Sequence, residues 1–286
     1  MLHKFIVEGE YMKIEWKNLY RGVIMGISDL VPGVSGGTMA FILGIYEQLI
    51  NSINRFFSRD WYKQIPFLLP LGIGMVSAIF AFSNLMEYLM ENYLQPTSFL
   101  FIGLIFGIIP MLLKTADIKN NFSKKHYVLV IIAFILVASM APFKDGTEAV
   151  IINELTFSTF LLLFFSGWIA SMALLLPGIS GSLVLLVIGT YASAVSAISN
   201  FNFPIIFTLG AGIVLGFILC SKIVRYLLQH YAVATFAVII GLVLGSAVVV
   251  FPGISSNIVM NFISILTFII GFFFVQIIGR KNDMKI

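Results

Sequence analysis

Charge is scarce in this chain: of its 286 residues, only 10% are Asp, Glu, Lys or Arg. A soluble domain carries about 25% charged residues, so the polar surface that would keep a globule in water is missing. A single cysteine, Cys220, excludes an internal disulfide framework and a cysteine-based metal site. The three histidines lie far apart in the sequence. We therefore expect no metal cofactor, and among the partners no nucleic acid.

Hydrophobic residues dominate instead, at 59% of the chain. A helix that crosses a membrane needs about 20 consecutive, mostly apolar residues. The uncharged runs close to this length are Ile65–Met86, Thr97–Leu113, Tyr127–Ala141, Phe157–Leu176, Pro204–Ser221, Ala232–Val250 and Ile258–Ile278. The chain is therefore predicted to be an all-α polytopic membrane protein with a single transmembrane domain over residues 1–286.

Two further apolar stretches, Gly22–Val31 and Gly37–Ile50, are too short to cross. Ten helical residues rise about 15 Å, half of the roughly 30 Å hydrocarbon layer. The two stretches flank the sequence Pro32-Gly33-Val34-Ser35-Gly36. Half-length helices that meet at a Pro/Gly break are typical of a re-entrant hairpin. Such backbone is tolerated in a membrane only where protein or a wet cavity surrounds it.

The same break returns as Pro177-Gly178-Ile179-Ser180-Gly181, and the similarity extends beyond it. Matching residues lie 145 positions apart around the breaks (Tyr46 and Tyr191) and 138 positions apart afterwards (Pro66 and Pro204). Two repeats are predicted, each with a re-entrant hairpin and two spans. The expected divisions are an interfacial or cytoplasmic segment at 1–21 (with a helix at Met12–Leu19), repeat 1 at 22–113, a one-span linker at 114–156, repeat 2 at 157–250, and the last span and cytoplasmic tail at 251–286.

Basic residues collect in the cytoplasmic loops of membrane proteins. If each hairpin enters and leaves on one side, six full spans remain. The net basic segments then share one side: 51–64, 114–126, 222–230 and the C-terminal tail. The net acidic segments 87–96 and 142–156 share the other. Both termini are then cytoplasmic, and the three spans between the hairpins invert the second repeat, an architecture typical of secondary transporters.

The breaks themselves are suited to anions. A helix N-terminus presents unpaired N–H groups and partial positive charge, glycine admits a close approach to the backbone, and hydroxyls add donors. We predict a midplane phosphate or carboxylate site formed by Ser35, Gly36, Gly37, Thr38, Ser180, Gly181 and Ser182, with the chain turned by Pro32, Gly33, Pro177 and Gly178. The alternative is that Gly and Ser only permit tight packing of the hairpins.

Charges within the first hairpin are a second signal, because a charge at the bilayer centre costs roughly 2.5–3.5 kcal/mol on insertion scales. Asp29 could bind a coupling cation, carry a proton, or be a carboxylate capped by nearby Ser or N–H groups. Glu47, on the returning arm, could pair with Arg21. Lys222 and Arg225, three residues apart on one helix face, could hold a lipid phosphate at the inner leaflet or act as ordinary anchors.

The stretch from Arg21-Gly22 through Pro32-Gly33-Val34-Ser35-Gly36-Gly37-Thr38 to Gly44-Ile45-Tyr46-Glu47 resembles the opening signature of the bacterial polyprenyl-phosphate transporters. The resemblance covers nearly the whole chain, including the second break. It implies the return of undecaprenyl phosphate from the outer to the inner leaflet of the plasma membrane, where this lipid carrier serves envelope polymers. Coupling to a proton or a sodium ion is compatible with it. The sequence does not predict the oligomeric state.

Other functions fit the sequence less well. Undecaprenyl-pyrophosphate phosphatases share inverted repeats and a Pro-Gly-x-Ser motif, but Gly36 and Gly181 stand where that family has an Arg, and no Glu pair faces the motif. Phosphoryl transfer needs such charge neutralisation and a positioned base, so we expect no enzyme activity. A transporter or channel for a small anion is the alternative that remains open, and a structural or assembly role is weaker.

Overall fold

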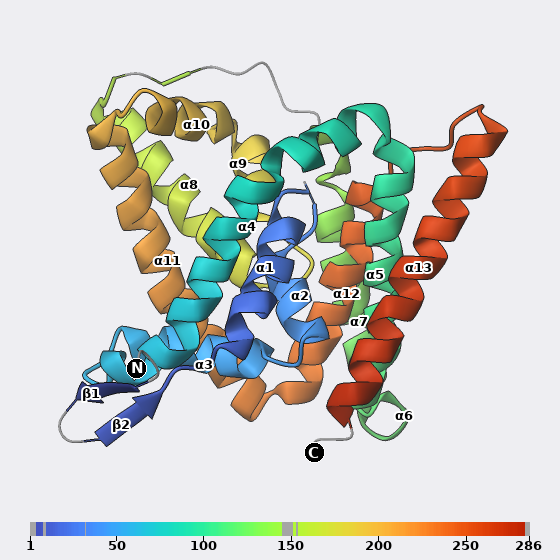
Figure 1. The fold of residues 1–286 in the computed structure, drawn as a ribbon, viewed down its shortest axis with the longest axis horizontal. Coiled ribbons are helices and arrows are strands. Elements are labelled where there is room, and N and C mark those ends of the chain that lie inside the picture. The colour runs from blue at the N-terminus through green and yellow to red at the C-terminus, as the bar shows by residue number, and fades with distance from the viewer. Residues whose placement is uncertain (1–3, 8–9, 32, 145–150, 153, 284–286) are drawn as a thin grey trace.

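The computed structural model describes residues 4–7, 10–31, 33–144, 151–152 and 154–283, so Pro32 lies outside the described residues. This part of the chain is almost entirely helical (Figure 1). Its elements are β1 (Lys4–Val7), β2 (Glu10–Lys13), α1 (Lys17–Asp29), α2 (Gly36–Ile42), α3 (Tyr46–Phe56), η1 (Trp61–Gln64), α4 (Ile65–Asn92), α5 (Leu94–Thr115), α6 (Ile118–Asn121), α7 (Lys124–Ala138), η2 (Ala141–Phe143), α8 (Phe157–Leu175), α9 (Gly181–Ile188), α10 (Tyr191–Ser199), α11 (Phe203–His230), α12 (Ala232–Val250) and α13 (Ile258–Asp283).

Within the described residues, seven helices are long and apolar enough to cross a membrane: α4, α5, α7, α8, α11, α12 and α13. The pair α9 and α10, bent by 108° at its break, could add an eighth. The all-α polytopic membrane fold is therefore confirmed. The sequence predicted six full spans because it assigned the run that forms α8 to a hairpin. Helices α4 and α11 have 28 residues each, about 42 Å, and extend beyond the hydrocarbon layer.

Helices from the two halves of the chain pack in matching pairs. Helix α1 packs along α4 as α8 packs along α11, and α5 packs along α13 as α12 packs along α7. Glycines permit the close approach: Gly22 faces the Leu71 carbonyl, and Gly167, 145 positions later, faces the Leu209 carbonyl. A Cβ at either glycine would clash with that backbone. Helices α7 and α13, which the sequence left outside the repeats, occupy matching positions beside α12 and α5.

The first returning arm is shorter than predicted. Helix α2 ends at Ile42, and the chain turns at Gly44, whose φ of 67° suits glycine. Residues 46–56 then form the separate helix α3, which buries Tyr46, Leu49 and Ile50. A continuous arm over Gly37–Ile50 was therefore wrong. Figure 1 shows α3 at one end of the molecule, near β1 and β2, and α9 and α10 at the opposite end.

The predicted interfacial helix at Met12–Leu19 was also wrong. Strands β1 and β2 pair antiparallel there, with Lys4 opposite Lys13, and α1 begins only at Lys17. Phe5, Ile6, Val7 and Tyr11 are aromatic or β-branched residues, which favour strands over helices. Helical propensity in so short a segment is too weak to override that pairing.

Candidate functional site

The first break ends in a helix N-terminus that the protein caps itself. The Gly36 amide donates to the Asp29 carboxylate at 2.6 Å, and the Gly37 amide donates to the Ser35 hydroxyl at 3.1 Å. Position 36 must be small, because a Cβ there would lie 2.8 Å from a carboxylate oxygen of Asp29. Partly buried Asp29 thus occupies the position that an external anion would take at α2. Of the roles open to Asp29, the geometry displays the capped carboxylate.

The second break has no such carboxylate. Leu174 takes the place equivalent to Asp29, 145 positions on. The Ser180 and Ser182 hydroxyls lie 2.8 Å apart and bond to each other. Among the described residues, no side chain accepts from the amides of Gly181 and Ser182 at the start of α9. In the described structure, two neighbouring helix N-termini therefore differ: a carboxylate accepts from the first amide of α2, whereas no side chain accepts from the first amides of α9.

The two breaks are joined directly. The Gly178 amide donates to the Thr38 hydroxyl at 2.9 Å, and the Ser35 hydroxyl donates to the Leu176 carbonyl at 3.4 Å. The Tyr46 hydroxyl donates to the Leu175 carbonyl at 3.1 Å. The side chains of Ser35, Thr38 and Ser180 are almost fully buried, and Pro177 is buried as well. The structure therefore brings the two predicted groups of site residues together inside the protein.

Both breaks also rest on α12. Gly33 has φ +88° and lies against the side chains of Val249 and Val250. Gly178 has φ +86° and lies against the backbone of Leu242 and Val243. At each position the left-handed backbone and the close neighbour both require glycine.

An apolar cavity of about 180 Å³ adjoins the first break. Its walls come from α1, α2, α3, α4, α8 and α11, and its residues include Asp29, Gly36, Leu49, Gly72 and Phe217. Asp29 is the one charged residue in this lining. We call this space the apolar cavity. It places hydrocarbon-like surface directly beside the capped N-terminus of α2.

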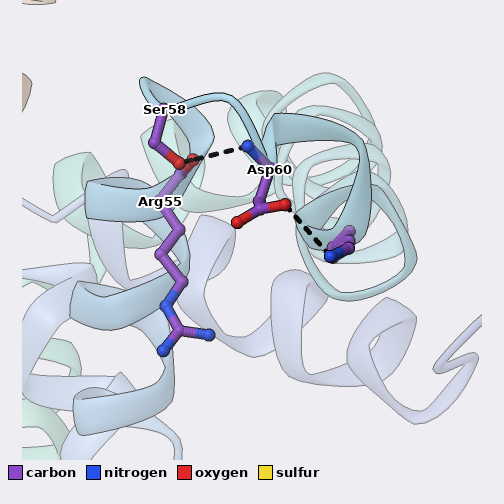
Figure 2. Close-up of polar contacts among 4 residues, drawn as sticks. Arg55, Ser58 and Asp60 are labelled. Atoms are coloured by element: carbon purple, nitrogen blue, oxygen red, sulfur yellow. Dashed lines mark hydrogen bonds and ion pairs between the residues drawn. The ribbon is translucent and has the colours of Figure 1, made fainter.

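The expected ion pair between Arg21 and Glu47 was wrong. Arg21 donates to the Asn18 side chain at 2.8 Å, on its own helix. Glu47 is exposed at the start of α3, because the returning arm ends before it. The ion pair found among the described side chains joins Lys63 and Asp60 at 3.0 Å (Figure 2). Glu47 is therefore not a charge held within the hairpin.

A larger polar cavity of about 650 Å³ lies on the other side of α3, lined by residues that include Glu47, Asn51, Arg55, Lys63, Arg225 and Gln229. We call it the basic cavity. Arg225 is half-buried and donates to the Asn54 side chain at 3.2 Å, whereas Lys222 is exposed and does not line the cavity. Arg55 and Lys63 belong to the segment 51–64, for which the sequence predicted only a net basic cytoplasmic loop. Their convergence with Arg225 depends on the packing of α3 against α11. The expected continuous arm over Gly37–Ile50 did not predict this packing.

No group of three or more His, Cys, Asp or Glu side chains that could hold a metal ion occurs within the described part of the chain. The polar groups at the breaks are amides, hydroxyls and one carboxylate.

A multi-pass helical fold with broken helices that meet in its interior is the architecture typical of secondary transporters. The chain belongs to the undecaprenyl phosphate translocase-like family, whose sequence model matches residues 25–264. It is 46% identical to the polyprenyl-phosphate transporter of Staphylococcus aureus over 278 residues, covering 94% of this chain and 97% of that protein. It is 34% identical to the polyprenyl-phosphate transporter of Vibrio cholerae over 245 residues, covering 81% of this chain and 76% of that protein. No solved structure matches the chain with significance.

Proposed function

We propose that this protein returns undecaprenyl phosphate from the outer to the inner leaflet of the bacterial plasma membrane, where the carrier is reused for envelope polymers. One observation carries the proposal: the two breaks are bonded to each other while only one of their helix N-termini is filled. The names of the two relatives support the polyprenyl phosphate as substrate. The phosphate would be carried through the protein and the polyprenyl tail through lipid.

In this proposal the phosphate head first binds at the open N-terminus of α9. The amides of Gly181 and Ser182 and the hydroxyls of Ser180 and Ser182 supply its donors. The donors at Ser35, Gly36, Gly37 and Thr38 join when the Asp29 carboxylate withdraws. The first isoprene units of the tail occupy the apolar cavity, which adjoins Gly36.

Asp29 provides the coupling step. A dianionic phosphate and an ionised carboxylate cannot both occupy the N-terminus of α2, because like charges at contact distance repel strongly in a low-dielectric site. A proton or a sodium ion bound to Asp29 would weaken its hydrogen bond to the Gly36 amide and release those donors. Phosphate binding and cation binding would then favour each other.

The proposed topology follows from the same arrangement. The two halves are inverted repeats, each with a re-entrant hairpin, and the first hairpin (α1 and α2) enters from the cytoplasm while the second (α8 and α9) enters from outside. Both termini are cytoplasmic. The matched packing of the two halves and the positions of α3 and α10 at opposite ends support this reading (Figure 1).

The test is leaflet exchange of undecaprenyl phosphate in vesicles that contain the purified protein, with and without proton and sodium gradients. Wild type should accelerate exchange, and one gradient should increase the rate. Asp29→Asn should lose the response to that gradient, and the double variant Ser180→Ala/Ser182→Ala should slow exchange. Ser264→Ala is the control, since this buried hydroxyl bonds only within its own helix. Unaccelerated exchange in wild-type vesicles would sink the proposal.

Two further arms separate the other functions. A transporter of small anions would be inhibited by inorganic phosphate or chloride at concentrations that leave a lipid transporter unaffected. A phosphatase would release phosphate from undecaprenyl pyrophosphate. We expect neither result, because among the described residues no arginine or paired glutamates stand at the breaks to stabilise a transferring phosphoryl group.

A further inference from the structure

The basic cavity is a second notable feature of the molecule. Its size, its charge and its exposure are not needed to form the two breaks. Its volume of about 650 Å³ lies within the range of small-ligand sites. Three cationic side chains from separate elements line it: Arg55 from α3, Lys63 from η1 and Arg225 from α11. Amide side chains, including Asn51 and Gln229, complete a polar wall.

Among the described side chains, no carboxylate forms an ion pair with the two arginines of this cavity. Figure 2 shows the Arg55 side chain directed away from Ser58 and Asp60, and Asp60 pairs with Lys63 instead. Arg225 contacts a neutral amide, that of Asn54. Glu15 and Glu47 also line the cavity. Nevertheless, among the described side chains neither acid forms an ion pair with Arg55 or Arg225.

Guanidinium groups that face a solvated cavity without a carboxylate partner suit a phosphate, whose oxygens they bind in a forked, charge-assisted arrangement. Helix α3 contributes residues to the lining of both cavities. Leu49 and Ile53 line the apolar side of this helix, while Asn51 and Arg55 line the polar side. The two cavities therefore border different sides of α3, the helix that Figure 1 shows near β1 and β2.

We infer that the basic cavity binds a phosphate monoester and is a second head-group site, where the lipid phosphate is received after it leaves the breaks. The binding site stands on the cavity alone, whereas its place in the transport path rests on the proposed function. A free phosphate ion would satisfy the same groups, so the two sources must be separated by experiment.

The test is direct binding to the purified full-length protein in detergent, with farnesyl phosphate, inorganic phosphate and uncharged farnesol as probes. Farnesyl phosphate should bind and farnesol should not. The double variant Arg55→Gln/Arg225→Gln should weaken one binding step by about tenfold or more, since charge-assisted hydrogen bonds are lost. Arg59→Gln/Lys222→Gln removes the same net charge from neighbouring positions outside the cavity lining and should change the affinity by less than about twofold.

A second variant should change the affinity for phosphate in the opposite direction. Glu47→Gln removes a negative charge from the cavity and should tighten phosphate binding by a few-fold. Preferential binding of farnesyl phosphate identifies the lipid head as ligand, whereas equal binding of inorganic phosphate identifies a free-phosphate site, and both outcomes support the cavity. Equal affinities in the two double variants overturn it.

The outcomes for the site and for transport can be told apart. Arg55 makes no side-chain bond in the described structure, so Arg55→Gln alone should fold like wild type and still weaken binding. If wild-type vesicles fail to exchange lipid but the binding pattern holds, the proposed function fails and the site remains. If exchange occurs but all variants bind equally, the site fails and the function remains.

Discussion

The Thr38 hydroxyl of the first break accepts a hydrogen bond at 2.9 Å from the Gly178 amide of the second, 140 residues away. A buried backbone donor needs an acceptor, and here the acceptor belongs to the other half of the chain. The two breaks consequently cannot separate without exposing or orphaning that amide. Any motion that opens the site must replace this bond.

Thr38→Val should destabilise the protein by about 1–3 kcal/mol, because the buried Gly178 amide loses its partner. The matched control is Thr190→Val. The Thr190 hydroxyl is fully buried and without a partner in the described structure, so its removal should be neutral or stabilising. Denaturant unfolding in one detergent measures both variants. Equal losses would contradict a specific bond between the breaks.

Comparing Gly178→Ala with Gly253→Ala separates two contributions to the loss of stability, namely backbone strain and overpacking. Both glycines have a positive φ, +86° and +89°, which costs a non-glycine residue about 1–2 kcal/mol. Gly253 faces open space, whereas a Cβ at Gly178 would meet the α12 backbone. Overpacking should therefore add about 1–3 kcal/mol at Gly178 only. Thermal unfolding of the two variants should differ accordingly, and similar melting temperatures would refute the contact with α12.

Gly72→Leu should block lipid exchange without unfolding the protein. Gly72 lines the apolar cavity, and nothing lies within 4 Å of a Cβ built there. Replacing a glycine inside a helix also removes a cost of about 1 kcal/mol. Gly210→Leu is the control at the matching position of α11, where the space is open as well but does not line the cavity. Normal exchange by Gly72→Leu would show that the tail does not use this space.

Gly103→Ala and Gly241→Ala test the equivalence of the two halves. Gly103→Ala would press a methyl group against the Phe268 carbonyl, and Gly241→Ala would press one against the Val130 carbonyl. The two glycines are 138 positions apart, and so are the two residues that they contact. Each should cost about 1–3 kcal/mol by overpacking. Gly210→Ala, in open space, should cost nothing. Unequal losses for the two packed positions, measured by denaturant unfolding, would count against matched repeats.

The spans and the breaks could be predicted because their signals are local. Uncharged runs mark α12 to the residue, from Ala232 to Val250, and the two Pro-Gly motifs mark the breaks. The divided returning arm could not be predicted so directly. Gly44 was visible, but a glycine within an apolar run is common in membrane helices, and only the packing of α3 against α11 makes it a turn.

For the candidate site, the residue types could be predicted from the sequence, but the hydrogen-bond partners of those residues could not. Ser35, Thr38 and Ser180 do converge, but the bond from Gly178 to Thr38 depends on how two hairpins far apart in the sequence dock. The position of Arg55 in the lining of the basic cavity had no local signal beyond its charge. Asp29 was noticed as a charge in an apolar helix, while its hydrogen bond to Gly36 required the turn geometry at the break.

The carboxylate that caps α2 has a consequence for selectivity. If the proposed function holds, an anion site filled by the protein's own acid would discriminate against inorganic anions at α2, because chloride or free phosphate would have to displace Asp29 with nothing to offset the cost. A prenyl chain brings apolar surface, worth about 25 cal/mol per Å² buried, into the neighbouring cavity of about 180 Å³. Asp29→Leu, which copies Leu174 of the second half, should accordingly let inorganic phosphate compete with the lipid in exchange measurements.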